Sequence, residues 1–404
     1  MKIALLHYSA PPIVGGVESV IAQHSLLMAD AGHEVSIIAG RGASFDPRIT
    51  LLQLPLLDSR NPDVLSVKAQ LDHGLIPKEF YVITSNLITQ LQPILSNVEV
   101  LIAHNVCSLH KNLALTAALK TLFTQGLIPR LILWHHDLAW TTPHYRAELH
   151  EGYPWELLRQ DWPGARLVVV SRLRQLELAE LIDISIDRID VIPNGVNIGL
   201  FNKLEMKTLE LVDRLNLLDS KPLILLPVRI TPRKNIELSL AVVNVLRQVF
   251  PQVKLIVTGP LGPHNPSNQD YFEKLVSIRD ELGLASSVHF LAELSDEYLP
   301  DSVILDFYHL SDALFLPSRE EGFGIPILEA AVAGMPIFCS DIPPLHDLAD
   351  RFADYFSPDG DPHVIASQID RRLRDLPTFE LRARVRASFS WERIYKKHIS
   401  PLLM

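Results

Sequence analysis

The sequence predicts a soluble α/β protein with two doubly wound domains, each a parallel sheet covered by helices. The chain has 404 residues, which is more than the about 100–250 residues of an ordinary domain. Short, continuously apolar runs alternate with longer segments suited to helices, and this alternation lapses once, near residue 195. Continuous apolar runs are typical of strands buried on both faces, as in parallel sheets.

The apolar runs predict the strands in chain order. Those of the first domain are KIALL, EVSIIAG, VEVLIAH, RLILWH, ARLVVVS and IDVIP. The pattern lapses over residues 192–222, where Asn194 and Gly195 form a turn dipeptide and a polar helix follows. Strands resume with LILLPV, VKLIVTG, VHFL, ALFLP and PIFCS. Helical connections between successive strands make βαβ the repeated unit.

The lapse divides the chain into domains over residues 1–195 and 196–385. A closing helix is expected over residues 386–404, where Trp391, Ile394 and Tyr395 form an apolar stripe. Whether this helix packs back on the first domain is left open. Doubly wound sheets bind ligands at the carboxyl ends of their strands, so a cleft between the domains is the expected site.

Composition excludes several classes of function. The formal net charge is −10 and neither domain has an excess of Lys and Arg, which disfavours nucleic-acid binding. Cys107 and Cys339 lie among small or apolar residues, as expected for buried thiols in a reducing, cytoplasmic compartment. No run approaches the ~18 apolar residues of a transmembrane helix, and the first residues predict a buried strand rather than a secretory leader.

The stretch SREEGFGIPILEAAVAG, residues 318–334, carries the clearest ligand-binding pattern. It predicts a loop after a strand and then a helix. Gly322 and Gly324 let backbone amides approach a ligand, and the helix start favours an anion such as phosphate. Glu329 lies about one turn into the helix, where its carboxylate can accept from two sugar hydroxyls, while Glu321 stays in the loop. The alternative is that Glu320 and Glu321 only complement a helix dipole.

Two cations follow the strand in LLPVRITPRKN. Arg229 and Lys234 lie five residues apart in a loop that Pro232 stiffens. Together they can neutralise a departing diphosphate electrostatically and so replace a metal ion. The alternative is a solvated basic loop, which is the expectation for Arg233.

In the first domain, Gly15 and Gly16 precede a helix and offer amides to an anion. The GxGxxG spacing is missing, which disfavours an NAD enzyme. His135 and His136 end a buried strand, and because adjacent strand side chains face opposite ways, they are not expected to share a metal. His104 and Asn105, after another buried strand, are weaker candidates for contacting the compound that accepts the transferred group.

The sequence SPDGDP has the spacing of a divalent-cation motif. It follows the last clear strand and precedes a helix, so Asp359 and Asp361 are interpreted as a turn and a helix start. No metal site is therefore expected there.

The 318–334 stretch, together with GGVES, HHDLAW, VVVSR, VIPNGVN, VRITPRKN and FSWERIY, resembles the signature of retaining glycosyltransferases of family 4. These enzymes have the GT-B fold of two facing Rossmann-like domains, and the resemblance covers nearly the whole chain. It implies metal-independent transfer of a hexose, mannose or glucose, from a nucleotide diphosphate sugar to a hydroxyl acceptor. No cofactor beyond the donor substrate is implied.

The resemblance also implies the site residues. Catalytic roles fall to His136, Arg229, Lys234 and Glu321, with His135 as the alternative if the register slips by one. Glu329 would bind the ribose and Glu321 would lie near the transferred sugar. The implied donor-binding residues are Gly15, Gly16, Arg229, Lys234, Leu291, Gly322, Phe323, Gly324, Ile325 and Glu329.

Departures from the family pattern leave the nucleotide base open. Asn197 stands where an aspartate is frequent, Ala292 replaces a frequent glycine, and TGPLGPHNPSNQDYF is longer than the usual turn. A non-catalytic nucleotide-sugar-binding subunit and a GT-B nucleotide-sugar epimerase are the alternative functions. The acceptor, the oligomeric state and peripheral membrane contact are also left open.

Overall fold

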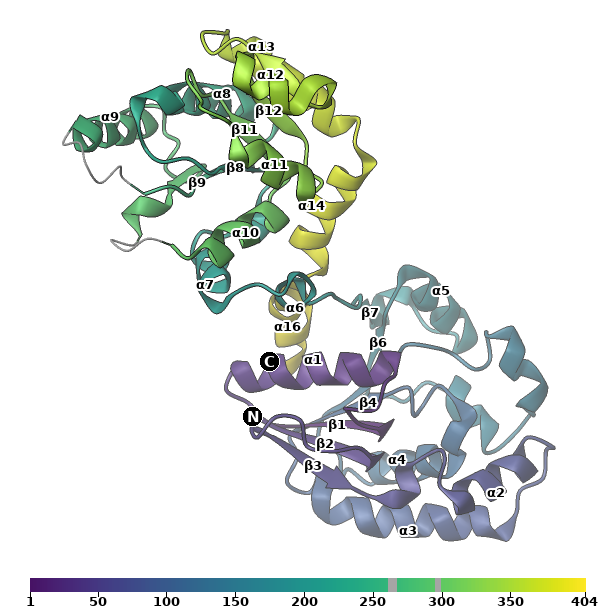
Figure 1. Cartoon of the computed structure of the whole chain (residues 1–404). Helices are drawn as coiled ribbons and strands as arrows, with labels where there is room; N and C mark the ends of the chain where they lie inside the picture. The colour runs from purple at the N-terminus through teal and green to yellow at the C-terminus, as the bar shows by residue number, and fades with distance from the viewer. Residues whose placement is uncertain (261–266, 295–298) are drawn as a thin grey trace. The chain divides into compact units, whose positions relative to one another are not determined.

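A computed structural model describes residues 1–260, 267–294 and 299–404 (Figure 1). The chain divides into two compact units, which are described separately. Unit 1 comprises Met1–Gly195 and Trp391–Met404, and unit 2 comprises Val196–Ser390. Unit 2 extends beyond the estimated domain end at residue 385 because helix α14 (Pro377–Phe389) continues to Phe389.

Unit 1 is built on a seven-stranded parallel sheet with strand order β3-β2-β1-β4-β5-β6-β7. The reversal of order beside β1 is the doubly wound arrangement. The strands are β1 (Lys2–Ser9), β2 (Glu34–Arg41), β3 (Ile49–Gln53), β4 (Val100–His104), β5 (Leu131–His135), β6 (Arg166–Val169) and β7 (Ile189–Val191). Strand β3 was not predicted, because this edge strand is only partly buried and has no continuous apolar run.

Alternate strand residues send side chains into two separate cores, one on each face of the sheet. Ile3 and Leu5 of β1 pack on one face, and Ala4 and Leu6 pack on the other. The first face is covered by α1 (Gly16–Asp30) and the C-terminal segment, and the second by α2 (Pro62–Leu71), α3 (Lys78–Leu95), α4 (Leu113–Thr124) and α5 (Arg172–Leu181).

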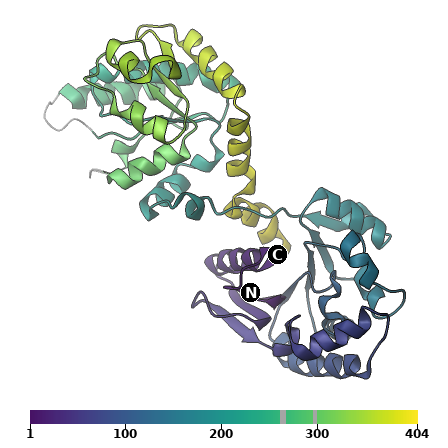
Figure 2. The ribbon, with the colours of Figure 1, turned by 45° about the vertical axis from the view of Figure 1, so that its right-hand side comes forward.

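The C-terminal segment is an integral part of unit 1. It consists of α15 (Trp391–Ile394), a π-helical turn (Tyr395–Ile399) and α16 (Ser400–Leu403), and it lies near α1 (Figure 2). The Trp391 ring packs edge-on against His24, with 5.3 Å between the ring centroids. The Arg130 guanidinium donates to the carbonyls of Leu402 and Leu403 at 2.8 and 2.7 Å, which satisfies the end of the last helix.

Unit 2 has a six-stranded parallel sheet with order β10-β9-β8-β11-β12-β13. Its strands are β8 (Leu223–Leu226), β9 (Lys254–Val257), β10 (Val288–Phe290), β11 (Ala313–Leu316), β12 (Ile337–Ser340) and β13 (Asp354–Phe356). The short edge strand β13 was not predicted, because three residues are too few for a recognisable pattern. Both units therefore confirm the prediction of Rossmann-like, doubly wound α/β domains.

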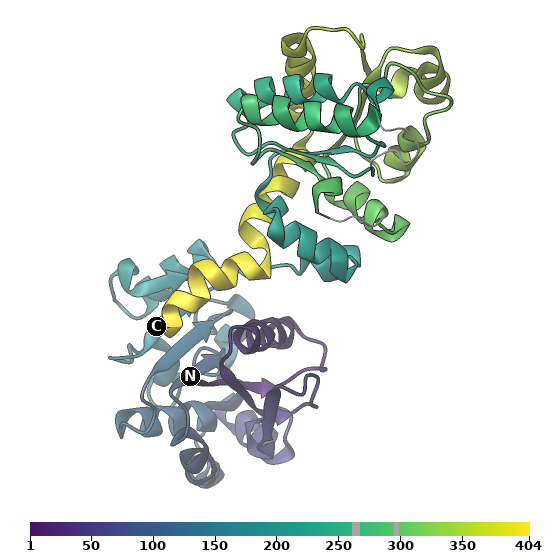
Figure 3. The same cartoon turned by 90° about the vertical axis from the view of Figure 1, so that its left-hand side faces the viewer.

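Helices cover both faces of the second sheet (Figure 3). Helix α8 packs against α9 and α13, while α10 packs against α7 and β8. The helices are α6 (Ile198–Asn202), α7 (Met206–Arg214), α8 (Ile236–Val249), α9 (Ser267–Glu281), α10 (Asp301–Leu310), α11 (Ile325–Val332), α12 (Pro343–Ala349), α13 (Pro362–Arg374) and α14. Asn197 caps α6 by accepting from the Leu200 N–H, so its departure from the family pattern has a local structural role.

A buried ion pair fastens α14 to this sheet. The Arg386 guanidinium donates to both carboxylate oxygens of Asp312, at 2.7 and 2.6 Å, and both side chains are less than a twentieth exposed. Asp312 also accepts from the Leu223 N–H at the start of β8. A buried carboxylate that loses its cation is strongly destabilising, so this pair fixes where α14 lies.

We predict that Arg386→Met lowers the free energy of unfolding by about 3–5 kcal/mol, because it leaves Asp312 buried without a cation. Urea unfolding followed by far-UV circular dichroism measures this change. All five tryptophans belong to unit 1, so their fluorescence reports that unit separately.

The exposed pair between Lys221 and Glu380, also on α14, gives the matched control. Lys221→Met should change stability by at most about 1 kcal/mol. Combining Arg386→Met with Asp312→Asn should recover part of the loss. Equal effects of Arg386→Met and Lys221→Met would contradict the prediction.

Candidate active site

Three loops meet at the carboxyl edge of the unit 2 sheet. Asn235, in the loop after β8, donates from its side-chain amide to the carbonyls of Pro317 at 3.1 Å and Pro358 at 2.8 Å. The Arg319 N–H donates to the carbonyl of Arg233 at 2.8 Å. Asn235 makes these bonds from a left-handed backbone conformation, with φ of +52°, which asparagine tolerates. The loops after β8, β11 and β13 are therefore tied into one surface.

A buried ion pair joins two predicted catalytic residues on this surface. Lys234 Nζ lies 2.5 Å from Glu321 Oε1, and the side chains are 9% and 7% exposed. The Ser318 hydroxyl donates to the same carboxylate oxygen at 2.7 Å, and the Arg233 guanidinium lies 3.9 Å from the other. Burial lowers the pKa of the Lys234 ammonium, and the bond to Glu321 counteracts that shift. The pair presents a cation whose position is fixed before a ligand binds.

The glycine-rich loop leads directly into α11. Gly324 has φ of +103°, and a Cβ atom there would lie 2.6 Å from the Leu345 side chain. Both the backbone and the packing thus require glycine at this position. Gly322 has open space beside its α-carbon, and the side chains of Phe323 and Ile325 are exposed. Residues 322, 323 and 325 are exposed, and the start of a helix favours an anion.

Glu329 lies about one turn inside α11, as predicted. The hydroxyl of Tyr308, on α10, donates to Glu329 Oε2 at 2.5 Å. Tyr308 is 21 residues away along the chain, and nothing in the sequence pattern connects it with Glu329. The contact between Tyr308 and Glu329 was therefore not predicted.

The remaining predicted donor residues lie beside the same edge of the sheet. Arg229 is exposed after β8 and has no ion-pair partner in the part of the chain that the structure describes. A Cβ atom on Gly259 would lie 1.9 Å from the Val228 carbonyl oxygen, so the loops after β8 and β9 are in close contact. Leu291, directly after β10, is buried, with 2% of its surface exposed. The long segment after β9 includes residues 261–266, which lie outside the described residues.

The aspartates of SPDGDP have structural partners. Asp359 pairs with Arg319, and Asp361 caps α13 by accepting from the His363 N–H at 2.8 Å. The interpretation as a turn and a helix start therefore holds.

In unit 1, the carboxyl ends of β1, β4 and β5 bring three histidines together. His104 Nδ1 lies 3.1 Å from His136 Nε2, and His7 Nδ1 donates to the His104 carbonyl at 2.7 Å. Asn105, with φ of +58°, accepts from the His136 N–H at 2.7 Å and from the Asp137 N–H at 3.2 Å. The predicted residues His104, Asn105 and His136 thus form one hydrogen-bonded cluster.

These imidazoles are neutral near pH 7. Burial lowers the pKa of His136 to about 3 and that of His7 to about 4. It also lowers the pKa of His135 and of His24 to about 4 and about 3. Neutral imidazole rings suit hydrogen bonding to a sugar better than stabilising a charge. Hydrogen bonding to the sugar is the role that the family resemblance implies for His136.

A carboxylate lies beside the first glycine of the pair in unit 1. Glu18, on the first turn of α1, accepts from the Ser9 hydroxyl and lies 3.9 Å from His7 Nε2. A Cβ atom on Gly15 would collide with this carboxylate, whereas nothing approaches Gly16. A carboxylate beside Gly15 repels phosphate and can accept from hydroxyls.

One group of described residues brings three metal-type ligands close together. It consists of Asp72, His110 and Glu148 in unit 1. The Lys68 ammonium lies 2.6 Å from the Asp72 carboxylate and 3.0 Å from the Glu148 carboxylate. A lysine thus already balances this group, and a metal ion would have to displace it.

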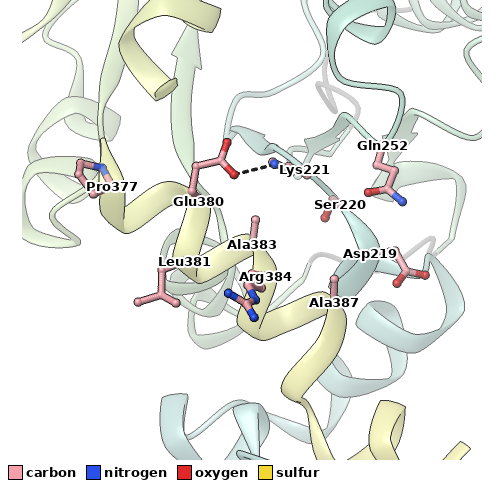
Figure 4. Close-up of a pocket in the computed structure, with 10 residues that line it drawn as sticks. All are labelled: Asp219, Ser220, Lys221, Gln252, Pro377, Glu380, Leu381, Ala383, Arg384 and Ala387. Atoms are coloured by element: carbon pink, nitrogen blue, oxygen red, sulfur yellow. Dashed lines mark hydrogen bonds and ion pairs between the residues drawn. The ribbon is translucent and has the colours of Figure 1, made fainter. Parts of the chain in front are cut away.

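A cavity of about 540 Å³ in unit 2 lies away from the predicted site (Figure 4). Lys221 and Gln252 on its wall lie two residues before β8 and β9, so the cavity is at the amino ends of these strands. Its other wall is α14, and Glu380 and Lys221 pair across it at 2.7 Å. Doubly wound sheets bind ligands at the opposite edge.

Two family models match the chain. The model for Glycosyltransferase Family 4 matches residues 14–200, and that for Glycosyl transferases group 1 matches residues 209–388. The chain belongs to the family 4 glycosyltransferases. This confirms the predicted family and the prediction that the protein is a glycosyltransferase.

Two known enzymes are similar along most of the chain. The mannosylglucosylglycerate synthase of Thermotoga maritima is 26% identical over 383 residues, which cover 85% of this chain and 83% of the relative. The MMP alpha-(1->4)-mannosyltransferase of Mycolicibacterium hassiacum is 26% identical over 373 residues, covering 84% and 81%. A solved sucrose-phosphate synthase from Thermosynechococcus elongatus aligns over 99% of this chain and 98% of its own, with 18% identity and a TM-score of 0.39.

No helix within residues 1–260, 267–294 and 299–404 is both long enough and apolar enough to cross a membrane.

We predict that the buried histidines make unit 1 sensitive to acid. Their folded-state pKa values lie below the value of about 6.5 in an unfolded chain, so the unfolded state binds more protons as the pH falls below about 6.5. Stability is therefore lost progressively from pH 6.5 towards pH 4. For His24, the loss between neutral pH and pH 5 should be about 2 kcal/mol. Urea unfolding followed by tryptophan fluorescence measures it.

His24→Leu should make this pH dependence shallower by about that amount. The exposed His73 provides the matched control, and His73→Gln should leave the dependence unchanged. An unfolding midpoint in urea that is constant from pH 7.5 to pH 5 would refute the prediction.

Proposed function

We propose that the protein transfers a hexose, mannose or glucose, from a nucleoside diphosphate sugar to a hydroxyl acceptor, with retention of the anomeric configuration and without a metal ion. The observation that carries the proposal is the buried Lys234–Glu321 pair beside the open glycine loop of α11. The names of two relatives, a mannosylglucosylglycerate synthase and a mannosyltransferase, favour mannose.

Cationic groups take up the charge of the leaving diphosphate. Lys234 is fixed by Glu321, and Arg229 is exposed in the same loop. The amides of residues 322–325 add hydrogen-bond donors at a helix start. Such preorganised donors stabilise a developing anion without reorganising in the reaction, which is the usual task of a metal ion.

The carboxylates bind sugar hydroxyls in this proposal. When the diphosphate shares Lys234, Glu321 is free to accept from hydroxyls of the transferred hexose, while Glu329 accepts from the ribose. The acceptor attacks from the face that the leaving group vacates, and the departing phosphate oxygen takes the acceptor proton. The C–O bond to the phosphate breaks as the new glycosidic bond forms, so charge and protons balance. His136 serves as a neutral hydrogen-bonding partner of a sugar.

We predict that one nucleoside diphosphate among UDP, GDP and ADP stabilises the protein selectively. A ligand at 100 times its dissociation constant adds about 2.7 kcal/mol to the free energy of unfolding. Thermal unfolding with each diphosphate identifies the base, and the matching sugar donors then identify the hexose. Product analysis with an acceptor panel, including the anomeric configuration by NMR, tests the reaction.

Three outcomes would count against this proposal. Donor binding without transfer or hydrolysis across the panel would favour a non-catalytic subunit. An altered free sugar formed without an acceptor would favour an epimerase. Transfer that is abolished by EDTA and restored by a divalent cation would overturn metal independence.

We also predict that Lys234→Met lowers kcat by about 10²–10³, the typical effect of removing one preorganised electrostatic donor. Because this variant leaves Glu321 buried without its cation, it should also lose stability. The double variant Lys234→Met/Glu321→Gln should regain stability but not activity. The adjacent, exposed Arg233 is the matched control, and Arg233→Met should retain kcat within about threefold. If the double variant regained full activity, Lys234 would not have the proposed role.

A further inference from the structure

Tyr308 and Glu329 form a contact that the proposed reaction does not by itself require. The Tyr308 hydroxyl donates to Glu329 Oε2 at 2.5 Å, and Tyr308 is only 2% exposed. Burial and the neighbouring carboxylate raise the pKa of this phenol above its usual value, so it remains a donor. A hydrogen bond to an ionised carboxylate is among the stronger hydrogen bonds in proteins.

This bond divides the two oxygens of Glu329 between two tasks. Oε2 accepts from the phenol, whereas Oε1 has no comparable side-chain donor within the described residues. A carboxylate held at one oxygen loses rotational freedom about its last torsion. Its other oxygen then keeps a fixed direction. Because one carboxylate oxygen can accept two hydrogen bonds, it can bind both hydroxyls of a vicinal diol at once.

Helix α10, which carries the phenol, is fastened at two points. At its C-terminal end, Arg382 donates to the carbonyls of His309 and Ser311. Near its middle, Asp306 accepts from the Glu205 N–H at 2.9 Å and from the Thr208 hydroxyl of α7. Contacts with α7 and α14 thus hold the helix that carries the phenol.

We propose that Tyr308 is a positioning residue for the ribose-binding carboxylate of Glu329, and that this contact gives the site its preference for nucleotides with ribose hydroxyls. The inference rests on the proposed function, because it takes Glu329 as the residue that binds the ribose of the donor. Tyr308 does not contact the ligand and acts only through the orientation of Glu329.

The test compares two forms of one ligand in the full chain. The nucleoside diphosphate selected by thermal unfolding and its 2′,3′-dideoxy analogue are titrated calorimetrically into the native protein and Tyr308→Phe. Tyr308→Phe should raise Kd for the ribose form about tenfold, the effect of losing a hydrogen bond to a charged group. It should change Kd for the dideoxy form by less than twofold, because that form has no hydroxyl for Glu329.

Two further variants separate positioning from general structural damage. In a Glu329→Gln background, adding Tyr308→Phe should raise Kd for the ribose form by less than twofold, since coupled residues are not additive. Tyr355→Phe is the matched control, because its phenol donates to the Asp350 carbonyl in the same unit. It should leave both Kd values unchanged.

Equal weakening of both ligand forms by Tyr308→Phe would overturn the inference, as would full additivity with Glu329→Gln. Native protein that binds both forms equally would also overturn it while leaving nucleotide-sugar transfer intact. If no nucleoside diphosphate binds at all, the proposed function fails together with the inference.

Discussion

The ion pair between Lys234 and Glu321 is the interaction on which the candidate active site depends. Both charges are largely removed from water, which is unfavourable unless each has a partner in good geometry. The two residues are 87 positions apart and meet only because β8 and β11 are adjacent parallel strands whose carboxyl ends lie at one edge. Asn235 and Arg319 then tie the loops together through main-chain contacts. The pair therefore couples the folding of the sheet to the presence of a fixed cation for a diphosphate.

The polar sites of the two units differ in their electrostatics. The unit 2 surface carries paired charges beside the start of a helix, a combination that suits an anion. The unit 1 cluster consists of neutral imidazoles held by hydrogen bonds to main chain and to each other, with the Glu18 carboxylate beside Gly15. Hydroxyl groups, which both donate and accept, are well matched to such a surface. In the proposed reaction, the charged donor is therefore assigned to unit 2 and contacts with sugar hydroxyls to unit 1.

The fold was predictable wherever burial is continuous, and the errors occurred at sheet edges. Residues 3–6 of strand β1 form a continuous apolar run because helices cover both faces, whereas β3 and β13 lie at edges and are partly exposed or very short. At the site, the glycine motif predicted the loop that leads into α11. The structure gives the reason for Gly324: its backbone is left-handed, and a Cβ atom would collide with Leu345. Tyr308 could not be recognised, since a buried tyrosine in a helix has the same pattern whether or not it meets a carboxylate. The position of the Glu18 carboxylate beside Gly15 could not be predicted, because residue spacing does not show which way a side chain points within one helical turn.

The sequence by itself determined the two α/β units, the family and the residue types available for charge and hydrogen bonding. These follow from local patterns, namely apolar runs, glycine positions and motif spacing, which act over a few residues. The tertiary structure alone decided which of those residues meet: Lys234 with Glu321, Tyr308 with Glu329, and His7, His104 and His136 with one another. Such contacts depend on strand order and helix packing, and their energies come from removing paired groups from water, which no local pattern specifies.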